Sequence, residues 1–304
     1  MSTISPEQIN LVVVLGPTAS GKTALGVKLA QRFAGEIISA DSRQVYRGMD
    51  IGSGKDLEEY EQIPYHLIDI VDPGYEFNVF EFQKRFCDAF AEIQHRDHMP
   101  LLVGGTGLYL ESVLSQYQFT EVAINTELRE ALATQSHESL TARLKALNPK
   151  LHNTTDLLDR ERLVRAIEIA EAERHSKQPS VALPEISPII FGIKWERAVL
   201  KKRITERLKQ RMEHGLIEEV ERLHQQGVSW ESLHFYGLEY RFVAAYLKGE
   251  LNRNDMFQKL NSAIHTFSKQ QEKWFRRMER KGTTIHWLDG ASDPYTQAIE
   301  MLTP

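Results

Sequence analysis

The sequence lacks several features that define whole classes of protein. It has one cysteine, Cys87, in 304 residues, which excludes an internal disulfide and a cysteine-rich zinc site. No run of about eighteen apolar residues could span a membrane, and the start MSTISPEQIN has neither the basic residues nor the apolar stretch of a signal peptide. The eleven histidines show no zinc-binding spacing. These absences predict a cytoplasmic protein without zinc, in which Cys87 packs within a helix.

Charge is unevenly distributed along the chain. The net charge is −5, yet residues 194–281 hold 19 Lys and Arg against 12 Asp and Glu, which leaves 18 against 30 elsewhere. A basic C-terminal third on an acidic protein is typical of a face that docks nucleic acid. Solvated helix faces are the alternative interpretation.

The N-terminal stretch LVVVLGPTASGKT holds the clearest motif. Its glycine and lysine spacing lets backbone amides surround a phosphate, while Lys22 supplies a cation and Thr23 a hydroxyl for Mg²⁺. An apolar strand at 11–15 precedes the motif and a helix at 23–33 follows it, so the phosphate would lie at a helix N-terminus. The predicted phosphate contacts are Gly16, Pro17, Thr18, Ala19, Ser20, Gly21, Lys22 and Thr23. The motif does not say which reaction follows, or whether the loop also binds ATP.

The order of elements predicts an α/β fold with a P-loop NTPase-like parallel sheet core and helices on both faces. Short apolar strands are expected at 11–15, 36–39, 66–71 and 101–103, with helices between them. Functional loops then belong at the carboxyl ends of the strands.

A small all-helical insertion domain interrupts this pattern. Three helices with N-capping residues are expected between about 120 and 188, near Asn125, Ser136 and Thr155. The predicted domains are therefore a core of residues 1–118 and 189–304, and an insertion of residues 119–188. Strands return at 188–195 and 286–288, and long amphipathic helices are expected at 199–223 and 253–281.

Two positions at strand ends could carry chemistry. Asp41 follows a buried apolar run and could accept a proton from a group held against the phosphate, although an Asp there could equally cap the next helix. Thr106, among the glycines of GGTGLYL, suggests close backbone approach to a ligand, or a plain glycine turn.

Weaker signals lie in two further motifs. HLIDIVD places Asp69 and Asp72 where a carboxylate could help to hold magnesium, or where a strand ends in a turn. DRERLVRAIEI places Arg162 and Arg165 three residues apart on a helix, where they could grip successive phosphates or form ion pairs with Asp159 and Glu168.

Taken together, the motifs resemble those of the tRNA dimethylallyltransferases, which prenylate the adenosine 3′ of the anticodon. GPTASGKT, ADSRQVYRGMDIGSGK, VGGTGLYL, DRERLVRAIEI, GLEYR and KQQEKWFR occur in the order and spacing of that family over nearly the whole chain. The combination with DSRQVYRGMDIG and GGTGLY is specific, whereas the phosphate loop alone is common.

The resemblance implies that the loop binds dimethylallyl diphosphate with Mg²⁺, and that diphosphate is the leaving group. It implies that Asp41 is the base, that Thr106 lies beside the reacting groups, and that Lys22 and Thr23 stabilise the departing diphosphate. The adenine would leave its stack and enter a channel between core and insertion. By the same resemblance, the anticodon stem-loop would contact Asp41, Ser42, Arg43, Gln44, Thr106, Glu161, Arg162, Leu163, Val164, Arg165, His234, Gly237 and Arg241.

Three departures from the family pattern occur. The loop 52–56 reads GSGKD instead of GTAKP, His234 stands where arginine is common, and Gln270 replaces a cation. None of them removes Asp41, Lys22 or Thr106.

Other functions compatible with the motifs are a P-loop small-molecule kinase, a prenyltransferase acting on free adenine nucleotide, and a non-catalytic RNA-binding module. The kinase leaves the basic C-terminal third unexplained, and the free-nucleotide enzyme does not need Arg162 or Arg165. A monomer is expected, since nothing in the sequence requires a dimer. The sequence does not identify the tRNAs that are modified or the donor chain length that is accepted.

Overall fold

The structure is a computed structural model that describes residues 9–117, 119, 121–149, 160–175 and 181–302. The chain forms two compact units, one of residues Met1–Tyr117 with Leu183–Pro304 and one of residues Gln118–Ala182. The core unit contains, in chain order, β1 (Leu11–Leu15), α1 (Lys22–Arg32), β2 (Gly35–Ala40), η2 (Leu57–Tyr60), β3 (Tyr65–His66), α2 (Val79–His95), β4 (Met99–Gly104), α3 (Gly107–Leu114), β5 (Pro188–Lys194), α7 (Arg197–Glu213), α8 (Leu216–Gln225), α9 (Trp230–Phe235), α10 (Leu238–Leu247), α11 (Arg253–Arg280), β6 (His286–Asp289) and α12 (Pro294–Leu302).

The core is built on a parallel sheet of order β3-β2-β4-β1-β5-β6. Its central strand β1 pairs with β4 and β5 in parallel, so that Val13 lies between Leu102 and Ile190. All five residues of β1 are buried, as a strand covered on both faces requires. The α/β prediction is confirmed.

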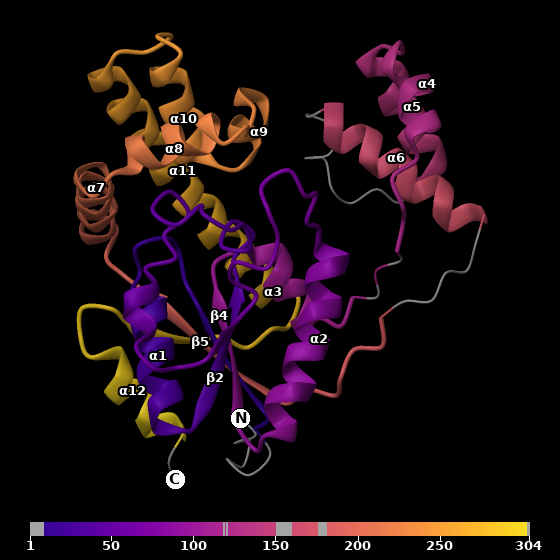
Figure 1. The fold of residues 1–304 in the computed structure, drawn as a ribbon. Coiled ribbons are helices and arrows are strands. Elements are labelled where there is room, and N and C mark those ends of the chain that lie inside the picture. Colours follow the sequence, from indigo (N-terminus) through magenta and orange to yellow (C-terminus); the bar gives the residue numbers. More distant parts are fainter. Residues whose placement is uncertain (1–8, 118, 120, 150–159, 176–180, 303–304) are drawn as a thin grey trace. The chain divides into compact units, whose positions relative to one another are not determined.

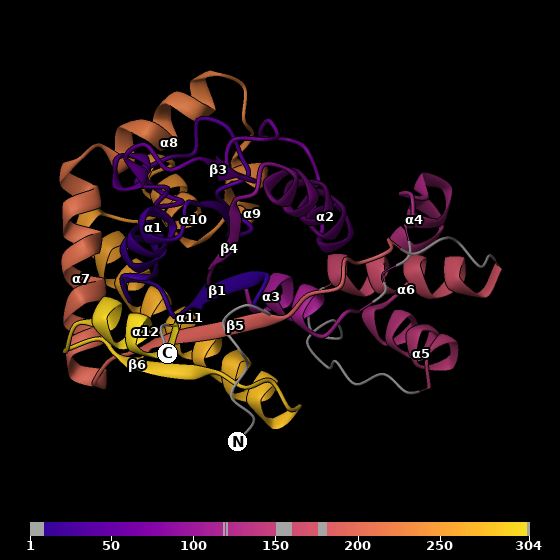
Figure 2. The ribbon, with the colours of Figure 1, turned by 90° about the horizontal axis from the view of Figure 1, so that it is seen from below.

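Helices cover both faces of the sheet (Figure 1; Figure 2). Alternate strand residues such as Val13 and Leu102 pack with α2, α3 and the end of α11. Their neighbours Val12 and Leu101 pack with α1 and α12. Because side chains alternate along a strand, each strand contributes to both cores, which holds its carboxyl end in place.

A third apolar cluster joins α7, α8, α9, α10 and the first half of α11 to the residues that follow β2, including Val45 and Met49. The predicted helix 199–223 is in fact two helices, because Gly215 adopts φ 98° between α7 and α8. This helical cluster therefore stands against the loop that carries Asp41.

The strand predicted at 66–71 is much shorter than expected. Only Tyr65 and His66 pair with β2, and Leu67 and Asp69 have positive φ values of 64° and 55°. Backbone in the left-handed region cannot continue a strand. Asp69 instead binds the buried ammonium of Lys55, and Asp72 pairs with Arg47 at the surface. Both carboxylates are thus paired with basic side chains of the core unit.

A buried carboxylate ties the amino end of the sheet together. Glu36, 2% exposed, accepts two hydrogen bonds of 2.8 Å from Arg96 and contacts His66 and His98 at 2.7 Å. The hydrogen bonds from Arg96, followed by those from the two histidines, lower the pKa of Glu36 to about 2. Glu36 lies near the start of β2, whereas Asp41 follows its end, so this cluster is structural.

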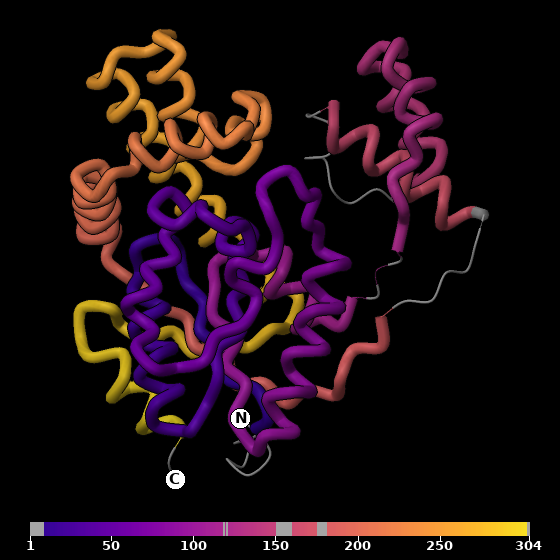
Figure 3. The backbone as a smooth tube through the Cα atoms, in the orientation of Figure 1, coloured from indigo at the N-terminus to yellow at the C-terminus, as the bar shows by residue number. Residues whose placement is uncertain are grey.

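The second unit is a helical bundle of α4 (Thr126–Ala133), α5 (His137–Leu147) and α6 (Arg160–His175). Figure 3 traces the backbone of these helices. Leu163 and Ile167 of α6 pack with Leu132, Leu140 and Leu144. Residues 155–159 of the predicted third helix, with the capping residue Thr155 and with Asp159, lie outside the described residues. Asn125 and Ser136 cap α4 and α5 as predicted.

Two further expectations can be compared with the structure. Cys87 is half-buried in α2, and burial raises the pKa of its thiol to about 11, so the thiolate that reacts and binds metals is disfavoured. Among the described residues, the helices are all too short or too polar to cross a lipid bilayer.

Candidate active site

The phosphate loop connects the end of β1 to the start of α1. Its backbone turns sharply at Ala19 and Gly21, with φ values of 61° and 90°, and α1 begins at Lys22. Side-chain atoms would not fit at Gly16, because a Cβ there would lie 2.6 Å from Oγ of Ser20. Lys22 and Thr23 are half-buried at the helix N-terminus, where backbone amides and the helix dipole favour an anion.

Side chains from the C-terminal half hold this loop in shape. Gln271 of α11 accepts a hydrogen bond of 2.8 Å from the amide of Thr18 and donates one of 2.9 Å to the carbonyl of Gly105. Trp195 donates to the carbonyl of Ser20 and Arg203 to that of Ala19, both at 2.9 Å. The Thr18 amide is therefore bonded to Gln271 in this structure, and its contact with phosphate stays a prediction.

Asp41 and Thr106 come together because β2 and β4 are neighbours. Ala40 pairs with Gly104 at the ends of the strands, and the Thr106 amide donates to the Ala40 carbonyl at 3.1 Å. The Thr106 hydroxyl accepts from the amide of Ser42 at 3.0 Å. This arrangement leaves the hydroxyl hydrogen of Thr106 to donate to a ligand.

Asp41 does not cap a helix. Its Oδ1 accepts a hydrogen bond of 2.9 Å from the amide of Arg43, but the residues that follow form turns. The carboxylate also lies close enough to Lys22 to oppose in part the lowering of the lysine pKa that burial causes. The structure thus brings the sequence-predicted carboxylate and phosphate-loop lysine together at one edge of the sheet.

Three arginines of α7 face the same region and were not assigned to it from the sequence. Arg203, Arg207 and Arg211 are spaced four residues apart, so they lie along one side of the helix. Arg207 forms an ion pair with Asp56, and Arg211 lies 3.1 Å from Glu239. The four-residue spacing of these arginines could have indicated a shared face. Basic residues on the other sides of α7 made that spacing hard to recognise.

These charges change the acidity of the phosphate-loop lysine. Burial, followed by the neighbouring Arg207 and then by Arg211, lowers the pKa of Lys22 to about 8, against the opposing effects of Asp41 and Asp56. Arg207 and Arg211 therefore add positive charge around the ammonium group.

The loop 52–56 fits against these arginines. A Cβ at Gly54, where φ is 65°, would lie 1.7 Å from Nη2 of Arg211, so a side chain at position 54 would displace the Arg211 guanidinium. Buried Glu219 accepts hydrogen bonds from the amides of Asp50, Ile51 and Gly52 at 2.7 to 2.9 Å. The loop is thus held by the Arg207–Asp56 ion pair and by the carboxylate of Glu219.

One of the predicted RNA contacts that follow Asp41 forms hydrogen bonds within the protein. Gln44 is buried, and its amide accepts from Ser39 at 2.7 Å and donates to the Gly54 carbonyl at 3.1 Å. Ser42 and Arg43 remain half-exposed, and the Arg43 guanidinium lies 5.7 Å from the ring centroid of exposed Phe235.

The predicted contacts around Gly237 lie next to this loop. Gly237 has a φ of 140°, and a Cβ there would be 3.6 Å from Nε of Arg43. His234 and Arg241 are exposed. Gly237 thus lies beside Arg43, and His234 and Arg241 are open to solvent.

In the helical unit, the five predicted RNA contacts divide into two kinds. Glu161 and Arg162 are exposed and Val164 is half-buried. The side chain of Leu163 is fully buried in the bundle core, and the RNA contact at this residue stays a prediction. Arg165 donates to Glu168 at 3.1 Å and to the carbonyl of Val122 at 2.7 Å, so the ion pair with Glu168 forms.

The family comparisons agree on one kind of protein. A family described as IPP transferase matches residues 44–278, and one described as isopentenyl transferase matches residues 9–63. The chain is 68% identical to tRNA dimethylallyltransferase 1 of Geotalea uraniireducens over 96% of this chain and 97% of the relative. It is 66% identical to the protein of that name from Geotalea daltonii, over 97% and 95%.

Solved structures show the same similarity. A tRNA isopentenylpyrophosphate transferase from Bacillus halodurans has a TM-score of 0.70 at 33% identity, covering 96% of this chain and 94% of that one. A eukaryotic dimethylallyltransferase acting on tRNA has a TM-score of 0.75 at 23% identity, covering 96% and 77%. The second similarity concerns the fold.

Proposed function

Because this chain belongs to the tRNA dimethylallyltransferase family, we propose that Asp41 and the phosphate loop transfer a dimethylallyl group from dimethylallyl diphosphate to the exocyclic amine of the adenosine 3′ of the anticodon. The chain is a prenyltransferase that modifies tRNA. The observation that carries the site assignment is the meeting of Asp41, Thr106 and Lys22 at the carboxyl edge of the sheet.

In the proposed reaction, the adenine nitrogen attacks the allylic carbon while the carbon–oxygen bond to diphosphate breaks. The diphosphate leaves with the electron pair, and Asp41 takes the proton released by the amine. The loop amides, Lys22 and Arg207 would stabilise the negative charge that grows on the leaving group. Thr106, whose hydroxyl accepts from Ser42, would donate to a reacting group.

Magnesium fits this site only with help from the substrate. The hydroxyl of Thr23, half-buried in the first turn of α1, would hold the ion together with diphosphate oxygens and water. The described residues contain no group of three acidic, histidine or cysteine side chains that could hold a metal. When bound, Mg²⁺ would supply further neutralisation of the leaving group.

The RNA surface of the proposal keeps the accessible residues. Ser42, Arg43, His234 and Arg241 would contact the anticodon stem-loop from the core unit, beside Gly237. Glu161, Arg162, Val164 and Arg165 would contact it from the helical unit, Arg165 while bonded to Glu168. We further propose that the protein is a cytoplasmic monomer.

Labelled substrates test the function directly. Unmodified tRNA is incubated with labelled dimethylallyl diphosphate, with γ-labelled ATP, or with labelled donor and free AMP in place of tRNA. We expect label in tRNA from the prenyl donor alone. Label transferred from ATP would identify a kinase, and efficient labelling of AMP would identify a free-nucleotide enzyme.

The lowered pKa of Lys22 predicts pH-dependent donor binding. The ammonium of Lys22 loses its proton as the pH rises through about 8, so a diphosphate meets one positive charge fewer at higher pH. We expect binding of inorganic diphosphate to weaken, with a calorimetric Kd that rises on the order of tenfold between pH 7.5 and 9.5. In a Lys22→Arg variant, whose guanidinium stays charged, this loss should disappear. An unchanged loss in that variant would assign the effect to another group.

A further inference from the structure

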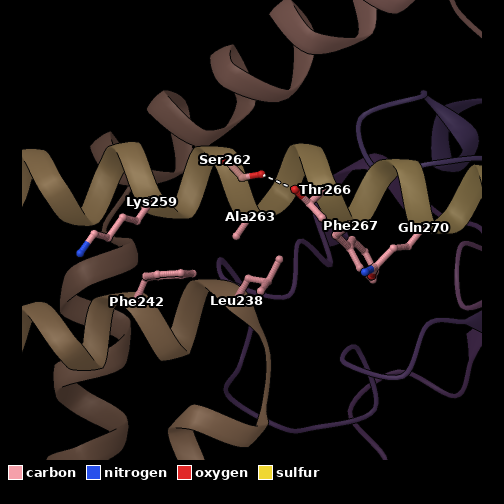
Figure 4. Close-up of a pocket in the computed structure, with 8 residues that line it drawn as sticks. All are labelled: Leu238, Phe242, Lys259, Ser262, Ala263, Thr266, Phe267 and Gln270. Carbon is pink, nitrogen blue, oxygen red and sulfur yellow. Dashed lines mark hydrogen bonds between the residues drawn. The ribbon is translucent and has the colours of Figure 1, made fainter. Parts of the chain in front are cut away.

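A groove between α10 and α11 lies outside the groups used above. It has a volume of about 460 Å³ and is lined by Leu238, Phe242, Lys259, Ser262, Ala263, Thr266, Phe267 and Gln270. Figure 4 shows Phe242 and Leu238 on α10 facing the α11 side chains. Most of the lining is apolar, and Lys259 is its one ionisable residue.

One end of the groove adjoins the loop after β2 that carries Asp41 and Arg43. Leu238 follows Gly237, at which a Cβ would lie 3.6 Å from the Arg43 side chain. Gln270 precedes Gln271, which binds the Thr18 amide and the Gly105 carbonyl. From there the groove follows α11 for eleven residues to Lys259, about 16 Å at the rise of a helix.

The lining chemistry favours one kind of occupant. Phe267 is 43% exposed, and Phe242 is half-exposed on the opposite helix, so both offer ring surface. Single-stranded RNA is bound by stacking unpaired bases on aromatic rings and by pairing phosphates with cations. An isoprenoid tail would use the rings but has no use for the ammonium of Lys259 at the far end.

We propose that the groove binds an unpaired nucleobase of the tRNA next to the target adenosine, stacked on Phe267, with a backbone phosphate at Lys259. This inference rests on the proposed function, because it places the base beside the loop that holds Asp41. The groove would thereby hold the RNA backbone while the target base turns toward the carboxylate.

A double-mutant cycle tests the stacking. Anticodon stem-loop RNAs that lack single bases on either side of the target adenosine are compared with intact RNA, using the natural enzyme and a Phe267→Ala variant. We expect loss of one flanking base to reduce kcat/KM about tenfold in the natural enzyme, and to cost nothing further in the variant. Met301→Ala is the control, because Met301 is a similarly exposed apolar residue on α12, 49% exposed.

A second measurement tests the phosphate. Lys259→Gln should reduce the slope of log Kd against log salt for stem-loop binding by about 0.7, the value for one phosphate contact on a single strand. Equal effects of every abasic RNA on the natural enzyme and on Phe267→Ala would overturn the proposal. So would a changed preference for donor chain length in Phe267→Ala with unaltered RNA dependence, which would assign the groove to the isoprenoid.

Failure of the proposed function would be recognised separately. In that case the natural enzyme would transfer no dimethylallyl group to intact stem-loop RNA. Normal transfer to intact RNA, without coupling between Phe267 and any flanking base, would overturn only the inference about the groove.

Discussion

Replacing Asp41 with alanine is expected to reduce turnover by on the order of 100-fold or more, while tRNA binds nearly as well as before. The reason is that the amine of adenine is a weak nucleophile until its proton has an acceptor, and Asp41 is the carboxylate beside Thr106 and Lys22. Single-turnover rates with saturating RNA report the chemical step, and filter binding reports RNA affinity.

Asp41→Asn separates this role from the local turn. Asparagine keeps an oxygen that can accept from the Arg43 amide, the hydrogen bond that Asp41 makes at 2.9 Å, but it takes up no proton. We therefore expect the asparagine variant to be nearly as slow as the alanine variant. Asp72→Ala, which removes a surface carboxylate paired with Arg47, is the matched control. Normal turnover in Asp41→Asn would show that Asp41 only shapes the loop.

Replacing Arg211 with methionine should destabilise the core unit by about 3 kcal/mol. Arg211 and Glu239 have side chains only 12% and 16% exposed, so the substitution leaves a carboxylate with little access to water. Burial already raises the pKa of Glu239 against the effect of Arg211. Without the arginine the carboxylate would take up a proton, which limits the loss. Urea unfolding at pH 7 measures it.

Two further variants identify the cause of that loss. Arg211→Met combined with Glu239→Gln should recover most of the stability, because no unpaired charge is then buried. Lys209→Met on the same helix should change stability by less than about 0.5 kcal/mol, since its ion pair with Glu206 is exposed. An equally large loss in the double variant would mean that packing, and not the ion pair, holds Arg211 in place.

The sequence predicted the parts of the fold that depend on local pattern. The apolar run at 11–15 and the capping residues Asn125 and Ser136 were sufficient because neighbouring residues determine those elements. The strand expected at 66–71 failed, since Leu67 and Asp69 adopt left-handed backbone that apolar periodicity does not reveal. Likewise, Gly215 divides a continuous helical pattern into α7 and α8.

The sequence identified the candidate reactive residues but not the contacts that hold their loops in place. Lys22, Asp41 and Thr106 stand in sequence motifs whose residue types and spacing indicate phosphate binding or proton transfer. Gln271 supports the phosphate loop from 253 residues away, and no local pattern reports such a contact. Gln44 and Leu163 also stand in recognisable motifs, and the motifs do not show that Gln44 bonds to Ser39 and that Leu163 packs in the bundle core.

The hydrogen bonds of Gln271 join two loops of the N-terminal half to a helix that is synthesised much later. Synthesis proceeds from the N-terminus, so the phosphate loop emerges long before the amide that joins it to Gly105. A nascent chain released before α11 is complete would carry an intact GPTASGKT sequence with an unbraced loop. Premature termination late in the gene should therefore yield a polypeptide that retains much of the sheet. This polypeptide would lack the side chain that joins the phosphate loop to Gly105.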